Sequence, residues 1–214
     1  PMSIVYRKDM FNKDGTNKLY LYGYGSYGHT VDPTFKSTII PLLDRGFVYV
    51  ISHVRGGSFL GFKWYEDGKM ERKINTFHDF NACAEHLIRE NYTFDKGITI
   101  EGRSAGGLLV GAAMTMRPDL YNTVIAGVPF VDVMNTMCDP TIPLTIPEWE
   151  QWGNPNQQKY YDLMIQYSPY DNIRDNNYPH ILALGGLNDP RVAYWEPSKF
   201  IAKLRHHNNS NNNM

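Results

Sequence analysis

Apolar residues fall into short runs that are separated by longer amphipathic stretches. Residues 46–52 are nearly all apolar or β-branched, which is typical of a parallel strand buried on both faces. Residues 75–88 repeat their apolar positions at helical spacing, and Thr76 and Asp79 are spaced for a capping box at the helix start. The apolar stripe of this predicted helix consists of Phe77, Phe80, Ala84 and Leu87.

Similar runs predict the other elements of the fold. Strands are expected at residues 3–7, 18–24, 97–101, 123–128 and 181–185, with the last two buried, and a short helix is expected within 35–43. Residues 129–179 are too long for a simple crossover, so we expect an irregular insertion over the functional site. Because strands alternate with helices, the sheet should be parallel, with functional loops after the carboxyl ends of its strands.

Two glycines flank a serine between one predicted strand and the next helix. The pattern Gly102-x-Ser104-x-Gly106 follows the strand at 97–101 and precedes a helix of small residues. Glycines allow a sharp bend without a Cβ clash, and the bend presents the serine hydroxyl above the sheet. The pattern therefore indicates a nucleophile elbow carrying Ser104, and a glycine-rich strand-to-helix loop is the alternative.

A later strand end carries an aspartate. Asp189 follows the strand at 181–185, and in a Ser-Asp-His set of this chain order the acid holds an imidazole in the correct tautomer. The pair Asp189-Pro190 fits equally well a turn, or the cap of a helix that begins at Trp195. These residues alone leave both interpretations open.

Acyl transfer also needs hydrogen-bond donors for the developing oxyanion. The backbone N–H of Ala105, the residue after the predicted nucleophile, is one expected donor. The stretch Tyr22-Gly-Tyr-Gly-Ser-Tyr-Gly28 lies after another strand, where the second donor is usually found. A tyrosine hydroxyl held by glycines would reach the oxyanion, and the alternative is that these tyrosines only pack a loop.

Composition adds mainly exclusions. With 214 residues and a formal net charge of −1, the chain suits one buried domain and gives no reason to expect nucleic acid or an anionic membrane as a partner. There is no apolar run of membrane-spanning length and no signal-peptide layout, so we expect a cytoplasmic location. Cys83 and Cys138 form no spaced framework, and residues 206–214 are expected to be an asparagine-rich, low-complexity tail.

Four blocks of sequence together resemble the catalytic domain of prolyl oligopeptidase-family serine peptidases, in particular the oligopeptidase B branch. The blocks are Tyr22-Gly-Tyr-Gly-Ser-Tyr-Gly28, Arg55-Gly-Gly57 with Trp64-Tyr-Glu-Asp-Gly68, Gly102-Arg-Ser-Ala-Gly-Gly107 and Leu187-Asn-Asp-Pro-Arg-Val-Ala-Tyr-Trp-Glu-Pro197. The resemblance implies an α/β-hydrolase fold over residues 1–205, a mostly parallel sheet with helices on both faces. It implies Ser104 as the nucleophile, Asp189 as the triad acid, Tyr24 as an oxyanion donor and Arg191 as a residue that holds the peptide.

The oligopeptidase B branch cuts after Lys or Arg. The resemblance places the acidic determinants of that preference at Glu148 and Glu150. Residues two apart on a helix do not face the same way, so we expect Glu148 to contact the basic side chain. Pro147 at the first helical position, followed by Glu148, also fits an ordinary helix start.

The triad histidine is absent from the chain as given. His206 and His207 follow Asp189 but fall within the helix that begins at Trp195, so the resemblance implies a base, and a C-terminal strand, beyond Met214. Without that base, we expect residues 1–214 alone to be inactive. The resemblance also implies a β-propeller before Ser3. The earlier histidines, expected to be core, loop or surface residues, are His29, His53, His78, His86 and His180.

The activity predicted for the whole protein is that of a serine endopeptidase. It would hydrolyse oligopeptides after Lys or Arg through an acyl-enzyme on Ser104, with no metal or organic cofactor. One alternative is a non-catalytic hydrolase-fold module that binds peptides. Another is an esterase or exopeptidase on the same fold.

Overall fold

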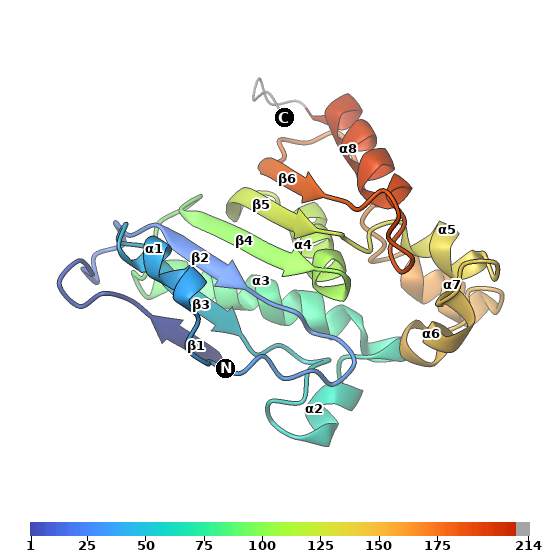
Figure 1. Ribbon diagram of the computed structural model, residues 1–214, viewed down its shortest axis with the longest axis horizontal. Helices are drawn as coiled ribbons and strands as arrows, with labels where there is room; N and C mark the ends of the chain where they lie inside the picture. Colours follow the sequence, from blue (N-terminus) through green and yellow to red (C-terminus); the bar gives the residue numbers. More distant parts are fainter. Residues whose placement is uncertain (209–214) are drawn as a thin grey trace.

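A single six-stranded sheet organises residues 1–208, the part of the chain that the computed structural model describes (Figure 1). The strands are ordered β1-β3-β2-β4-β5-β6, and only the β1 and β3 pair is antiparallel. Their bounds are β1 Met2–Val5, β2 Leu19–Tyr22, β3 Val48–Ser52, β4 Ile98–Arg103, β5 Tyr121–Gly127 and β6 His180–Leu184. The predicted strands and the mostly parallel sheet are confirmed.

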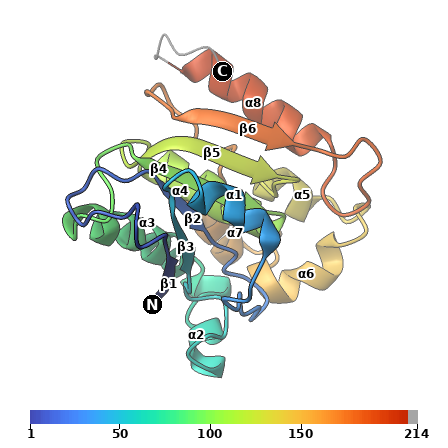
Figure 2. The same cartoon turned by 60° about the vertical axis from the view of Figure 1, so that its left-hand side comes forward.

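Helices in the connections cover the sheet. Figure 1 shows α1 in front of the sheet and α3 behind it, and α4 packs on α3, β4 and β5. Figure 2 shows α8 lying along β6. The helices are α1 Ile40–Leu43, α2 Phe62–Glu66, α3 Ile74–Arg89, α4 Ala105–Met116, α5 Val133–Cys138, α6 Thr145–Trp152, α7 Gln158–Met164 and α8 Trp195–His207, with 3-10 turns η1 Ser37–Ile39 and η2 Met70–Arg72. None of these helices is long and apolar enough to cross a membrane.

Burial follows the strand geometry. Every residue of β3 is buried, and the predicted stripe of α3 is fully covered, as expected. The prediction that the strand at 181–185 is buried is wrong, because Leu182 is 51% and Leu184 is 45% exposed. The reason is that β6 pairs only with β5 in the described part of the chain, so it lies at an edge of the sheet.

The predicted capping box of α3 is also wrong. The helix begins at Ile74, so Thr76 already lies in its first turn. The Thr76 hydroxyl donates to the carbonyl of Arg55 at 2.8 Å, and Asp79 accepts from the backbone N–H of Arg55 at 3.0 Å and from its guanidinium at 2.8 Å. These two side chains therefore attach α3 to the loop after β3 rather than cap its own N–H groups.

The segment 129–179 lies beyond the carboxyl ends of the central strands, as expected, and it consists of short helices joined by irregular stretches (Figure 1). It forms three short helices, α5, α6 and α7, and Trp152 on α6 is almost fully buried. At the other end of the chain, α8 runs through His206 and His207, as predicted for the helix that begins at Trp195, so these first two residues of the predicted low-complexity tail are helical. The rest of that predicted tail, residues 209–214, lies outside the described residues.

Candidate active site

Ser104 occupies a strained bend between β4 and α4. Its backbone lies at φ 55° and ψ −118°, where a residue with a Cβ is disfavoured. The bend is held from both sides, because the N–H of Ser104 donates to the carbonyl of Gly127 at 2.9 Å and the carbonyl of Ser104 accepts from the N–H of Gly107 at 2.8 Å. The predicted strand, turn and helix of a nucleophile elbow are confirmed.

Close backbone contacts explain both glycines of the elbow. A Cβ on Gly102 would lie 1.9 Å from the carbonyl oxygen of Gly106. A Cβ on Gly106 would lie 2.9 Å from the carbonyl oxygen of Gly23. Any side chain at either position would push the elbow apart, so the motif follows from steric exclusion around Ser104.

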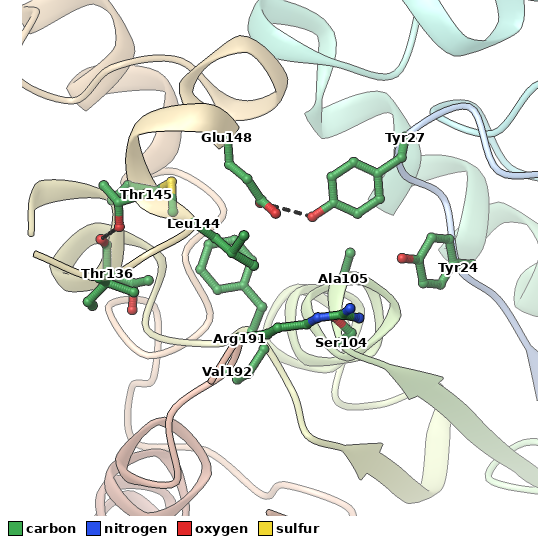
Figure 3. A pocket seen from close by; sticks show the side chains of 13 residues that line it. Tyr24, Tyr27, Ser104, Ala105, Thr136, Leu144, Thr145, Glu148, Arg191 and Val192 are labelled. Atoms are coloured by element: carbon green, nitrogen blue, oxygen red, sulfur yellow. Dashed lines mark hydrogen bonds between the residues drawn. The ribbon is translucent and has the colours of Figure 1, made fainter. Parts of the chain in front are cut away.

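Ser104 and Ala105 open into a cavity of about 290 Å³ (Figure 3). Its wall comes from the connections that follow four strands, β2, β4, β5 and β6, and from the α5 and α6 region. The lining residues are Tyr24, Tyr27, Ser104, Ala105, Phe130, Thr136, Met137, Ile142, Leu144, Thr145, Glu148, Arg191 and Val192. The structure thus brings together five of the residues that the sequence singled out, namely Tyr24, Ser104, Ala105, Glu148 and Arg191.

Tyr24 points its hydroxyl into this cavity (Figure 3). Its ring lies against the start of α4, since a Cβ on Gly106 would be 3.3 Å from the Tyr24 ring. Burial raises the pKa of the half-buried Tyr24 hydroxyl, so the hydroxyl keeps its proton at neutral pH. A protonated phenol beside the elbow can donate a hydrogen bond to an oxyanion, as the sequence predicted for this residue.

Glu148 holds its carboxylate in the cavity wall next to Tyr27. Its Oε2 accepts from the Tyr27 hydroxyl at 2.9 Å and from the Trp152 indole N–H at 2.5 Å. Its Oε1 accepts no hydrogen bond from the described residues. Glu150 is exposed and does not line the cavity, so the expected difference between the two glutamates is present in the structure. Pro147 was expected at the first helical position, but α6 begins at Thr145, so Pro147 is its third residue.

Asp189 forms a turn at the carboxyl end of β6. Its Oδ1 accepts the backbone N–H groups of Arg191 at 2.9 Å and Val192 at 3.1 Å, and these bonds lower the pKa of Asp189. The turn carries Arg191 and Val192 to the cavity wall, whereas Asp189 itself is not among the lining residues. The predicted turn at Asp189 is confirmed. Asp189 does not cap α8, because the N-cap residue of that helix is Tyr194. The role of Asp189 as the triad acid stays a prediction.

Sequence and structure comparisons agree with this arrangement. The sequence pattern of the prolyl oligopeptidase family matches residues 33–214. The chain belongs to the prolyl oligopeptidase family. It is 50% identical over its whole length to Protease 2 of Moraxella lacunata, of which it spans 31%, and 49% identical over 96% of its length to dipeptidyl aminopeptidase BI of Pseudoxanthomonas mexicana, of which it spans 28%.

The structure of oligopeptidase B from Leishmania major superposes with a TM-score of 0.97 at 55% identity, over 99% of this chain and 29% of that one. The structure of oligopeptidase B from Trypanosoma brucei, with covalently bound antipain, superposes with a TM-score of 0.97 at 55% identity, over 100% of this chain and 30% of that one. The predicted α/β-hydrolase fold and the resemblance to the oligopeptidase B branch are confirmed. The chain spans about a third of the length of these prolyl oligopeptidase relatives.

The histidines of this family member contact other groups. Within residues 1–208, no histidine hydrogen bonds to Ser104 or Asp189. His29 packs its ring edge on Tyr24 with 5.1 Å between centroids, and His53 stacks on Phe59 and hydrogen bonds to Ser3. The described part of the chain also contains no cluster of three His, Cys, Asp or Glu side chains that could hold a metal ion.

Two residues that contact Glu148 were not singled out from the sequence. Tyr27 was part of the quoted tyrosine motif but received no role of its own, and Trp152 was left out altogether. The signal for Trp152 was its position four residues after Glu148, which places both side chains on one face of α6. Burial and the neighbouring Glu148 carboxylate raise the pKa of Tyr27, so this hydroxyl stays a donor.

Removing the Tyr24 hydroxyl tests its predicted role in this family member. In the whole protein we expect Tyr24→Phe to lower kcat by about 10²–10³-fold, because one donor to the oxyanion is lost while the ring still packs against α4. Tyr22→Phe is the matched control, since Tyr22 lies on β2 and does not line the cavity. Steady-state kinetics on a peptide substrate measure both, and an unchanged kcat for Tyr24→Phe would leave Tyr24 as a packing residue.

Proposed function

We propose that this chain provides the catalytic site of a serine endopeptidase that hydrolyses oligopeptides after Lys or Arg. One observation carries the proposal: the Ser104 elbow and the Glu148 carboxylate open into the same cavity. In such a cavity the anionic wall would hold a peptide by its basic side chain, and the serine would attack the carbonyl of that same basic residue. Membership in the prolyl oligopeptidase family and the similarity to two oligopeptidase B structures support it.

The chemistry follows from the residues around Ser104. Its Oγ attacks the scissile carbonyl carbon and passes its proton to a histidine base, which the resemblance implies beyond the described residues. The carbonyl oxygen becomes an oxyanion that accepts hydrogen bonds from the Tyr24 hydroxyl and the N–H of Ala105. Ala105 is the first residue of α4, where helix N–H groups have no partner inside the helix. The amine leaves with a proton from the base, and water then hydrolyses the acyl-enzyme.

Asp189 and Arg191 complete the proposed site. Asp189 would orient the histidine base and stabilise its charged form, and its lowered pKa keeps the carboxylate ionised at neutral pH. Arg191 projects from the same turn into the cavity, where its guanidinium is placed to hold peptide carbonyl or carboxylate oxygens (Figure 3).

A second candidate function comes from a relative. Dipeptidyl aminopeptidase BI is 49% identical to this chain, and its name describes an exopeptidase. The same elbow and anionic wall would serve that activity if the substrate were anchored by its free amino terminus. The relatives are also about three times as long as this chain, which supports the further inference of a β-propeller domain in the whole protein. The cytoplasmic location stays a prediction.

A substrate panel tests the proposed function on the whole protein. The panel holds fluorogenic peptides with Arg, Lys, Gln, Leu or Pro before the scissile bond, each with a blocked and a free amino terminus. We expect the blocked Arg and Lys peptides to be cleaved about 10²-fold or more faster than the uncharged ones, since a neutral side chain gives the Glu148 carboxylate no cationic partner. If only peptides with a free amino terminus are cleaved, the result would favour a dipeptidyl aminopeptidase activity. If only esters are hydrolysed, the result would favour an esterase activity.

A further inference from the structure

A buried lysine, Lys73, contacts the loop that carries Tyr24 and Tyr27, and the chemistry proposed for Ser104 gives it no role. Lys73 stands between η2 and the start of α3 and is only 1% exposed. No carboxylate of residues 1–208 pairs with its ammonium group, and burial lowers the pKa of Lys73 to about 7. Burying an unpaired cation is costly unless other groups satisfy it, so its surroundings matter.

Three oxygens accept the three protons of the Lys73 ammonium group. Its Nζ donates to the carbonyl of Gly25 at 2.6 Å, to Oγ of Ser26 at 3.0 Å and to Oγ1 of Thr76 at 3.2 Å. The Thr76 hydroxyl gives its own proton to the carbonyl of Arg55, so toward Lys73 it acts as an acceptor. Two of the three oxygens belong to one segment, residues 23–28, which we call the tyrosine loop.

The tyrosine loop needs such support. It carries Tyr24 and Tyr27, and three of its residues, Gly25, Tyr27 and Gly28, have positive φ angles of 76°, 59° and 66°. Tyr27 pays a conformational penalty there because it has a Cβ. The Gly25 backbone also sits tightly on α3, since a Cβ at that position would lie 2.5 Å from Cγ2 of Thr76. The loop thus packs on α3, and Lys73, directly before α3, adds polar contacts at Gly25 and Ser26 to those that Gly56 and Ser58 make with Gly28.

The other side of Lys73 faces aromatic rings. Its Nζ lies 5.2 Å from the centroid of the Trp152 ring and 5.6 Å from that of Phe77. Trp152 donates its indole N–H to Glu148, and Tyr27 donates its hydroxyl to the same carboxylate oxygen. Lys73 thus touches the tyrosine loop and the side chain that supports Glu148 at the same time. Figure 3 shows Tyr24, Tyr27 and Glu148 following one another along the cavity wall.

We propose that Lys73 is a positioning residue that fixes the tyrosine loop against Trp152 and so sets the Tyr24 hydroxyl and the Glu148 carboxylate in one geometry. This inference rests on the proposed function. A tetrahedral ammonium group can bind three loop and helix oxygens and still contact two ring faces, which an apolar side chain of the same length cannot do. Without it the loop carbonyl of Gly25 would be buried unpaired, and the oxyanion donor would shift.

The test replaces Lys73 by methionine in the whole protein. We expect Lys73→Met to lower kcat for an Arg peptide by about 10–100-fold, because a displacement of roughly 1 Å at a catalytic group has effects of this size. Lys63→Met is the matched control, since the Lys63 side chain is 78% exposed and pairs only with Asp67 among the described residues. Far-UV circular dichroism and the melting temperature verify that each variant folds.

A double-mutant cycle separates positioning from general structural support. If Lys73 acts through Tyr24, Lys73→Met should lower kcat much less when Tyr24 is already phenylalanine. An equal loss of kcat in both backgrounds would overturn the proposal. If Lys73→Met does not fold, Ser26→Ala removes one acceptor and keeps the cation. We expect Ser26→Ala to lower kcat less than Lys73→Met would, and this loss should become smaller still when Tyr24 is already phenylalanine. A loss of kcat that is the same in both backgrounds would overturn the proposal.

Failure of this inference can be told apart from failure of the proposed function. If the wild-type protein shows no preference for Arg peptides and Tyr24→Phe leaves kcat unchanged, the proposed function is wrong. If both of those results are as expected but neither Lys73→Met nor Ser26→Ala lowers kcat, only the role of Lys73 is wrong.

Discussion

Ser104→Ala in the whole protein is expected to lower kcat/KM for an Arg peptide by about 10⁵–10⁶-fold, leaving only what the oxyanion donors contribute. Ser104 alone among the described serines has a positive φ at the junction of a strand and a helix. A fluorophosphonate probe should therefore label wild-type protein at this residue and should not label the variant. Peptide mapping of the labelled protein by mass spectrometry measures the site directly.

Ser198→Ala is the control for this experiment. Ser198 is exposed on α8, and its hydroxyl donates to the carbonyl of Tyr194, so no base or oxyanion donor activates it. Both labelling and turnover should equal those of the wild type. Labelling that persists in Ser104→Ala, or that appears on another serine, would show that the elbow does not carry the nucleophile.

Glu148→Gln is expected to lower kcat/KM for Arg and Lys peptides by a factor of roughly 30 to several thousand, which corresponds to about 2–5 kcal/mol of lost transition-state stabilisation. The kcat/KM for uncharged peptides should change little. The amide keeps the shape of the side chain and an oxygen that can accept from Tyr27 and Trp152. The pocket should therefore stay folded while it loses the charge that pairs with the substrate.

Glu150→Gln is a closely matched control for that result. Glu150 has the same charge, lies two residues further along α6, is exposed and does not line the cavity. Glu150→Gln should change kcat/KM for Arg peptides by a factor that corresponds to less than about 0.5 kcal/mol, since substitutions at exposed positions usually have small effects.

If Glu148→Gln lowers kcat/KM equally for charged and uncharged peptides, Glu148 supports α6 rather than binds the basic side chain of the substrate.

Local patterns predicted the elements of the fold well. The apolar run of β3 and the helical stripe of α3 need only the nearest residues to be recognised, and the elbow is a contiguous motif whose strand and helix follow directly. The exposure of β6 could not be obtained this way. An apolar run shows that a strand can be covered, but whether both its faces and its edge are covered depends on segments far away in the chain.

The contacts of the candidate site were harder to predict, because they join distant residues. Thr76 and Asp79 have the spacing of a capping box, yet both bind Arg55, more than twenty residues earlier. Lys73 stands in a charged stretch that suggests a solvated helix start, and only its contacts with Gly25 and Trp152 show that it is buried. For Tyr24 and Glu148 the resemblance to a known family, and not periodicity, pointed to the site.

The steric fit of the elbow also bears on how such a sequence can change by mutation. A side chain at position 102 would meet the backbone carbonyl of Gly106, which every residue at position 106 would carry, and a side chain at position 106 would meet the carbonyl of Gly23. No exchange of side chain at one of the two positions therefore makes room for a side chain at the other. Mutation is thus restricted at both codons by backbone packing, whatever peptide the protein acts on.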